Sequence, residues 1–120
     1  MTQLIAHLIG DYALQSHVMA IRKTSSLKWA CIHACFYGLP FLLLVSHWWQ
    51  WAVIVGTHAI IDRYRIAANW CQWYGVGHPG LWAKEEGFEY PQPFLGVWLT
   101  IIVDNTMHLT INYAALAVGG

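Results

Sequence analysis

The sequence WQWAVIVGTHAIIDRYRIAA occupies residues 49–68 and decides the fold that we expect. Most of its side chains are apolar, yet His58 and Asp62 stand four residues apart within it. A helix of this length rises by about 30 Å, which matches the hydrocarbon core of a bilayer. The stretch therefore predicts a membrane-spanning helix that carries two ionisable groups on one face.

The composition of the whole chain agrees with insertion into a membrane. Of its 120 residues, 58% are apolar and only 10% are charged, whereas an average soluble domain has about 25% charged residues. The formal net charge of zero offers no basic surface for a nucleic acid. We therefore expect a lipid bilayer, and no nucleic acid, as a partner. The alternative is a soluble helical bundle with a tryptophan-rich core.

Three further stretches resemble residues 49–68 in length and hydropathy. We expect helices over residues 2–20, 27–46, 49–68 and 94–118, packed as a single all-α domain over residues 1–120. Residues 69–93 contain three Pro and many aromatic side chains, which predicts a loop at the membrane interface, either a lid over a site or a docking surface. The expected architecture is an integral membrane four-helix bundle.

The cations predict how this bundle is oriented. All six Lys and Arg residues fall in or beside the first and third connections. Because connections rich in Lys and Arg stay in the cytoplasm, we expect both termini outside. The chain is then a multi-pass protein of the bacterial inner membrane.

Ionisable side chains inside the predicted helices follow a regular pattern. On three of the four helices a His and an Asp stand four residues apart, a spacing that places both on one helix face. The pairs are His7 with Asp11, His58 with Asp62, and Asp104 with His108, while His33 stands alone on the second helix. Burying such a group in a bilayer costs at least about 2.5 kcal/mol, so we expect them to share one site.

Histidine together with aspartate favours a transition metal over a cation that prefers oxygen ligands alone. We expect a divalent ion, with zinc first and manganese or iron as alternatives. Its candidate ligands are His58, Asp62, Asp104, His108, His7 and His33. Three other interpretations stay open: His33 is a hydrogen-bonded core residue, Asp62 pairs with Arg65, or the group relays protons without a metal.

Three short motifs resemble those of a known family. They are HLIGDYALQ at residues 7–15, THAIIDRYR at residues 57–65 and VDNTMHLT at residues 103–110. Together they resemble an uncharacterised family of small polytopic membrane proteins of bacteria and phages, over nearly the whole chain. Asn105 stands where the resemblance implies Gln. More distantly, the His-xxx-Asp pattern is similar to proteins described as membrane-bound metal-dependent hydrolases.

These residues favour an intramembrane metal-dependent hydrolase that cleaves a lipid or another membrane-embedded ester or phosphoester. The metal would activate a water molecule, and Asp11 would act as the general base. Arg63 and Arg65 would bind an anionic head group of the substrate, or serve only as topological anchors.

Two other classes of protein fit the same residues. One is a non-enzymatic interaction or exclusion protein of a phage or bacterium, in which the metal ties the helices together. The other is a small transporter of protons or metal ions, which would require a homo-oligomer to enclose a pore. An open coordination position on the metal distinguishes a catalytic site from a structural one.

Overall fold

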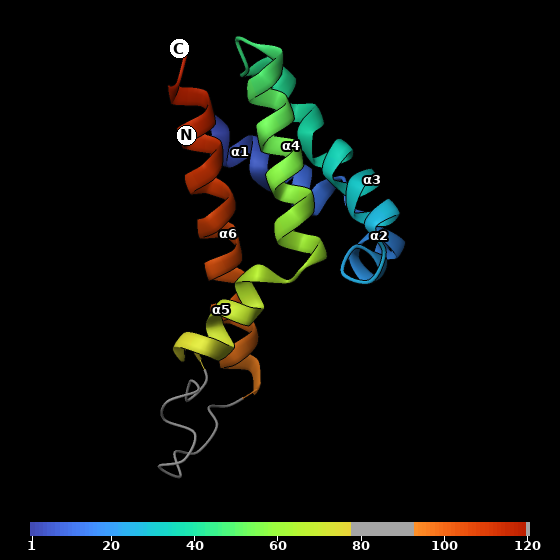
Figure 1. The fold of residues 1–120 in the computed structure, drawn as a ribbon, viewed down its shortest axis with the longest axis vertical. Helices are drawn as coiled ribbons and strands as arrows, with labels where there is room; N and C mark the ends of the chain where they lie inside the picture. The colour runs from blue at the N-terminus through green and yellow to red at the C-terminus, as the bar shows by residue number, and fades with distance from the viewer. Residues whose placement is uncertain (78–92, 120) are drawn as a thin grey trace. The chain divides into compact units, whose positions relative to one another are not determined.

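The computed structural model of the chain describes residues 1–77 and 93–119 (Figure 1). These residues form six α-helices, a π-helical turn and a 3-10 turn, and within them there is no strand. The elements in chain order are α1 (Thr2–Leu8), the π-helix η1 (Ile9–Ala13), α2 (His17–Arg22), α3 (Leu27–Gly38), the 3-10 helix η2 (Leu39–Leu43), α4 (Trp48–Arg63), α5 (Ile66–Tyr74) and α6 (Pro93–Ala117). The predicted all-α class is confirmed.

No helix in the described part of the chain combines the length and the hydropathy that crossing a membrane requires. This finding does not support the predicted four-helix membrane bundle, and it shows that the predicted multi-pass placement in an inner membrane with both termini outside is wrong. A segment that is apolar over twenty residues crosses a bilayer only as one continuous helix. Three of the four predicted helices are interrupted.

Each interruption has a local cause. The segment predicted at residues 2–20 changes to π-helical geometry at Ile9, and α2 starts anew where the Ser16 side chain accepts a hydrogen bond from Met19 N. In the second segment, Pro40 lies in the first turn of η2, where a residue without an N–H removes a helical hydrogen bond. In the third segment, α4 ends at Arg63, and Arg65, which has a left-handed backbone with φ of 51°, separates it from α5.

The chain divides into two compact units. Unit 1 comprises Met1–Tyr64 and His108–Gly120, and unit 2 comprises Arg65–Met107. Helix α6 therefore contributes its first part to unit 2 and its last part to unit 1. We describe each unit by itself.

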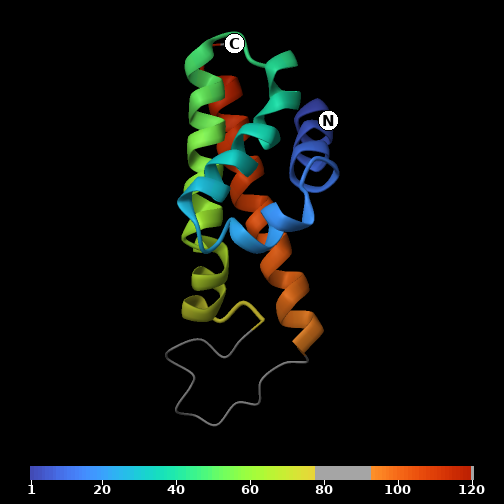
Figure 2. The same cartoon turned by 90° about the vertical axis from the view of Figure 1, so that its right-hand side faces the viewer.

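The core of unit 1 forms where α1, α3, η2, α4 and the end of α6 meet. Tyr37, Phe41 and Ile54 are its largest fully buried apolar side chains, with Ala6 and Ala115 packed beside them. Figure 2 shows α4 running alongside the C-terminal part of α6. These contacts hold the helices that carry the buried polar residues of this unit.

Helices α3 and α4 approach closely at Gly38. A Cβ atom there would collide with the Val55 side chain and lie 2.9 Å from Trp51 Nε1. The indole Nε1 of Trp51 instead donates a hydrogen bond to the Gly38 carbonyl oxygen at 2.9 Å. A larger residue at this position would therefore push the two helices apart.

Gln50 joins the start of α4 to the end of α6. Its Oε1 accepts hydrogen bonds from Ser46 N at 2.7 Å and His47 N at 2.9 Å. Its Nε2 donates to Ala115 O at 3.1 Å and Val118 O at 3.0 Å. Helix ends leave backbone groups unsatisfied, and this one buried amide satisfies some at both ends.

Unit 2 contains α5 and the first part of α6. Trp70 and Tyr74 stack with ring centroids 5.2 Å apart, and Trp73 lies 5.4 Å from Trp70. The predicted loop over residues 69–93 is therefore wrong at its start, because the chain is helical up to Tyr74. Residues 78–92 of that loop lie outside the described residues.

Candidate metal centre

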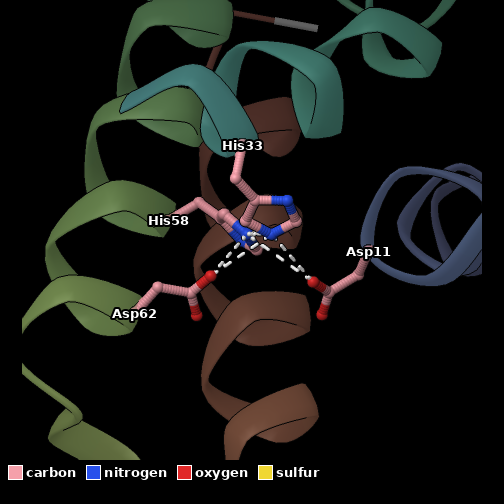
Figure 3. Close-up of side chains that lie close together, drawn as sticks. All are labelled: Asp11, His33, His58 and Asp62. Atoms are coloured by element: carbon pink, nitrogen blue, oxygen red, sulfur yellow. Dashed lines mark hydrogen bonds and ion pairs between the residues drawn. The ribbon is translucent and has the colours of Figure 1, made fainter. Parts of the chain in front are cut away.

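Two carboxylates and two imidazoles converge inside unit 1 (Figure 3). Asp11 comes from η1, His33 from the middle of α3, and His58 and Asp62 from successive turns of α4. One ligand atom of each residue lies within 4.8 Å of those of the other three. None of the four residues is more than 5% exposed. We call this group the Asp/His cluster.

The imidazole Nε2 atoms of His33 and His58 lie at its centre, 3.0 Å apart. Asp11 Oδ1 lies 3.2 Å from the former and 3.7 Å from the latter. Asp62 Oδ2 lies 3.3 Å and 3.2 Å from the same two nitrogens. Each carboxylate thus turns one oxygen toward the pair of imidazoles (Figure 3).

The π-helix η1 places Asp11 in this cluster. Single π-helical turns inserted in α-helices are frequent at functional sites. Gly10, the residue before Asp11, lies so close to α3 that an added Cβ would be 2.5 Å from the Tyr37 carbonyl oxygen. The absent side chain therefore lets η1 approach α3, which carries His33.

Lys23 also reaches the cluster. From the sequence, this lysine was expected only to help orient the chain in a membrane. Lys23 Nζ lies 2.9 Å from Asp62 Oδ2 and 3.8 Å from Asp11 Oδ1, and its side chain is 16% exposed. The turn between α2 and α3 brings this side chain back toward the carboxylates. Helical spacing carries no signal for such a contact, because no regular period relates Lys23 to Asp62.

The surroundings shift the pKa values of the four residues in different directions. Burial alone would raise the pKa of Asp62, but the imidazoles of His108, His33 and His58 outweigh it and hold this pKa well below its usual range. Burial would also raise the pKa of Asp11, which the His33 hydrogen bond and nearby positive charges lower instead. Both carboxylates are therefore ionised at neutral pH.

The two imidazoles differ from each other. Burial lowers the pKa of His58 to about 4, so this ring is neutral at pH 7. Burial also acts to lower the pKa of His33, but the hydrogen bond to Asp11 and the adjacent Asp62 carboxylate raise it above its usual value. Of the two imidazoles, His33 is thus the one that binds a proton more strongly.

The donor set fits a transition metal. Neutral imidazole nitrogens and carboxylate oxygens together bind zinc, manganese or iron. Asp62 Oδ2 is buried and accepts no hydrogen bond of good geometry from the described residues, although Lys23 forms an ion pair with it. A buried carboxylate oxygen of this kind suits a cation at the centre of the cluster. The cluster can therefore hold a metal ion, while the identity of the ion stays a prediction.

The predicted ligands His7 and His108 lie next to the cluster. His7 Nε2 is 3.9 Å from Asp11 Oδ2, and His108 Nε2 is 3.5 Å from Asp62 Oδ1. Each carboxylate thus has one oxygen facing the cluster and the other facing a further buried imidazole. His108 Nδ1 also lies 3.1 Å from Nδ1 of His58. The four-residue spacing predicted that His7 and His108 belong to the buried site. It did not distinguish the four residues of the Asp/His cluster from these two neighbours.

The remaining predicted residues occupy other places. Arg63 Nη1 donates a hydrogen bond to Thr24 O at 3.1 Å, which ties the end of α4 to the turn between α2 and α3. Asp104 and Arg65 belong to unit 2. The predicted roles of Asp104 as a ligand and of both arginines in substrate binding stay predictions.

The fold and cluster define an all-helical protein with a buried Asp/His site. By sequence, the chain belongs to a family described as protein of unknown function (DUF3307), which matches residues 1–118. The predicted membership of an uncharacterised family is thus confirmed. The match supports neither the membrane character nor the hydrolase relation that the resemblance implied. Neither the curated proteins nor the solved structures contain a match to this chain.

Proposed function

We propose that the protein is a metal-dependent hydrolase with a divalent ion bound by the Asp/His cluster. The observation that carries this proposal is the convergence of four buried donor atoms, from Asp11, His33, His58 and Asp62, within 4.8 Å of one another. Zinc is the first choice of ion, with manganese or iron as alternatives.

The protonation states of the ligands favour binding. Metal ligands must be neutral imidazoles or ionised carboxylates. His58, whose pKa is lowered to about 4, and the two carboxylates meet this requirement at pH 7. His33 meets it after releasing the proton that Asp11 and Asp62 stabilise.

A divalent ion at this position would supply Lewis acidity and a lowered pKa for water. In hydrolysis, the water oxygen bonds to the phosphorus or carbonyl carbon of an ester, the bond to the leaving oxygen breaks, and the leaving alcohol takes up a proton. Asp11 is the proposed general base that takes the proton from the water. Its Oδ2, which faces His7 at 3.9 Å, is the oxygen turned away from the imidazole pair.

Lys23 favours an anionic substrate. Its side chain is 16% exposed, whereas those of the Asp/His cluster are at most 5% exposed. A substrate entering past this ammonium group would pair an anionic oxygen with it. We therefore propose a phosphoester as the substrate class, with carboxylic esters as the alternative.

Elemental analysis of the purified protein tests the metal. We expect about one equivalent of bound divalent ion in the wild type and in His17→Ala, an exposed control on α2. We expect loss of the ion in the double variant His58→Ala with Asp62→Ala. Equally little metal in all three proteins would contradict the proposal.

An activity assay tests the chemistry. The metal-loaded wild type should hydrolyse bis(p-nitrophenyl) phosphate, and both a chelator and the double variant should abolish the hydrolysis. If the protein binds metal but cleaves neither this ester nor p-nitrophenyl acetate, the hydrolase part of the proposal is wrong.

The burial of the cluster favours a second function, a structural metal that ties η1, α3 and α4 together. Structural sites are saturated by protein ligands, whereas catalytic sites keep a position for water. With a structural ion, a chelator should lower the melting temperature of a protein that has no hydrolytic activity. With a catalytic ion, the metal-loaded protein should be active.

A further inference from the structure

We propose that Tyr37 is a positioning residue that orients two ligands of the metal centre, His58 through its ring and Asp11 through its hydroxyl. The proposal rests on the metal function proposed above and extends it to residues outside the Asp/His cluster. Tyr37 lies on α3, one turn after His33, and its side chain is fully buried.

The ring of Tyr37 stacks on the imidazole of His58. Their centroids are 3.6 Å apart and their planes differ by only 10°. A flat neighbour at this distance prevents the imidazole from turning about its Cβ–Cγ bond. The stacking therefore keeps Nε2 of His58 directed toward His33 and Nδ1 directed toward His108.

The hydroxyl of Tyr37 contacts Asn112 and His7 among its neighbours. Asn112 Nδ2 donates to the Tyr37 oxygen at 2.6 Å, and His7 Nδ1 lies 2.8 Å from the same oxygen. An amide nitrogen donates and does not accept, so the hydroxyl accepts from Asn112. Its own hydrogen is within reach of His7 Nδ1, and the proposed arrangement has the hydroxyl donate it to this nitrogen, with the ring proton of His7 on Nε2.

This arrangement selects one tautomer of His7. With Nδ1 accepting from Tyr37, the ring proton is on Nε2, which lies 3.9 Å from Asp11 Oδ2. At this distance the polar N–H group acts on that oxygen electrostatically, while Asp11 Oδ1 is the oxygen directed at the imidazole pair. Residues that contact a metal ligand without contacting the metal commonly set the orientation and the basicity of that ligand.

A role in packing alone makes a different prediction. Tyr37 contacts Phe41 in the core of unit 1, and a phenylalanine at position 37 would preserve that packing and the stacking on His58. The hydroxyl, in contrast, contacts Asn112 and His7 and takes no part in the stacking on His58. Removing the hydroxyl therefore separates the two roles.

The experiment compares Tyr37→Phe with wild type by ¹⁵N NMR of the histidine rings and by zinc titration against a chromophoric chelator. We expect His7 in the wild type to be the tautomer protonated at Nε2, and to become a mixture of tautomers in Tyr37→Phe. We expect zinc affinity to fall about 10- to 100-fold, the usual effect of losing a group behind a ligand.

Phe41→Leu is the control, because it perturbs the same core without touching the hydroxyl chain. It should lower the melting temperature and leave the His7 tautomer and zinc affinity unchanged. Asn112→Leu, which keeps Tyr37 in place, tests the same chain should Tyr37→Phe fail to fold, and it should also mix the His7 tautomers.

An unchanged His7 tautomer and unchanged zinc affinity in folded Tyr37→Phe would overturn the positioning role. If the wild type binds no zinc, the proposed function fails instead. The His7 tautomer of the metal-free protein still tests the hydrogen bonds that link Asn112, Tyr37 and His7. A failure of the positioning role can therefore be distinguished from a failure of metal binding.

Discussion

Lys23 Nζ lies 2.9 Å from Asp62 Oδ2, the same oxygen that faces the imidazoles of His33 and His58. The ammonium group therefore neutralises a carboxylate that a metal ion would bind. In the metal-free protein, Lys23 balances part of the charge of Asp11 and Asp62, and His33 balances a further part when it is protonated. A divalent ion entering this cluster must compete with both.

This competition predicts that Lys23→Met binds zinc more tightly than wild type. Removing a positive charge next to the cluster reduces its repulsion of the ion, and we expect a gain in affinity of about tenfold, since about 1.4 kcal/mol corresponds to that factor. The metal-free variant should unfold more easily by up to about 3 kcal/mol, because losing one partner of a fully buried ion pair costs about 3–5 kcal/mol and Lys23 is partly exposed.

Zinc titration and chemical denaturation in the presence of a chelator measure the two effects. Lys28→Met, which removes an exposed lysine of α3, should change neither. Weaker zinc binding by Lys23→Met would show that the lysine supports the ion rather than competing with it.

The sequence located the Asp/His cluster because part of it obeys helical spacing. His58 and Asp62 lie on the uninterrupted helix α4, so the four-residue spacing correctly places them on one face. Lys23 reaches the cluster through a turn, and Tyr37 through stacking between two helices. Contacts of these two kinds depend on how the helices and turns pack against one another. No regular spacing of residues in a single sequence predicts them.

The predicted placement in a membrane was wrong because the length of an apolar stretch does not show where a helix ends within it. Pro40 and the left-handed backbone of Arg65 each change the geometry inside an apolar stretch. Proline is readable from the sequence, but a non-glycine residue with positive φ is uncommon and has no sequence signal. The long helix α6, by contrast, follows its predicted limits within one residue.

The raised pKa of His33 predicts that metal binding releases a proton. The ion requires a neutral ring, and the carboxylates of Asp11 and Asp62 hold a proton on that ring in the metal-free protein. Zinc affinity should therefore fall about tenfold for each pH unit below the raised pKa of His33, and level off above it.

Calorimetric titration with zinc in two buffers of different ionisation enthalpy counts the released protons. We expect the number of released protons in the wild type to approach one as the pH falls below the raised pKa of His33. A variant with His33→Ala should bind zinc more weakly and release fewer protons. Zinc binding by wild type without any proton release would contradict the assignment of the proton to His33.

The same proton affects the stability of the metal-free protein. Because the pKa of His33 is higher in the folded than in the unfolded chain, its contribution is fully present below the unfolded value of 6.5 and is lost as the pH rises through the folded pKa. Denaturation in chelator should therefore show a loss of stability above pH 6.5. His33→Ala should lack this loss, and an identical pH profile in both proteins would be inconsistent with it.

The hydrogen bonds of Gln50 lie away from the Asp/His cluster, so we expect a substitution there to change the free energy of unfolding without changing zinc affinity. Replacing Gln50 with Leu removes hydrogen bonds at the start of α4 and the end of α6, each worth about 1 kcal/mol. We expect Gln50→Leu to lower the free energy of unfolding by about 2–4 kcal/mol and to leave the zinc affinity of the folded protein within about threefold of wild type. A much larger loss of zinc affinity would mean that this clamp also orients the cluster.

Two glycines provide the sharpest matched comparison. At Gly10 an added Cβ would lie 2.5 Å from the Tyr37 carbonyl oxygen and 3.0 Å from its Cα, and backbone atoms cannot rotate away. Gly10→Ala should therefore cost about 1–3 kcal/mol of stability, the usual effect of overpacking. Because Asp11 is the next residue, zinc affinity should fall as well. Gly56, in the middle of α4, has no atom within 4 Å of an added Cβ.

Gly56→Ala should accordingly stabilise the protein by about 0.5–1 kcal/mol through its better helix propensity, without a change in zinc affinity. Chemical denaturation and zinc titration of both variants measure these opposite effects. If Gly10→Ala keeps full zinc affinity while it loses stability, the close approach of η1 to α3 serves packing alone. In that case the position of Asp11 would not depend on the approach of Gly10 to Tyr37.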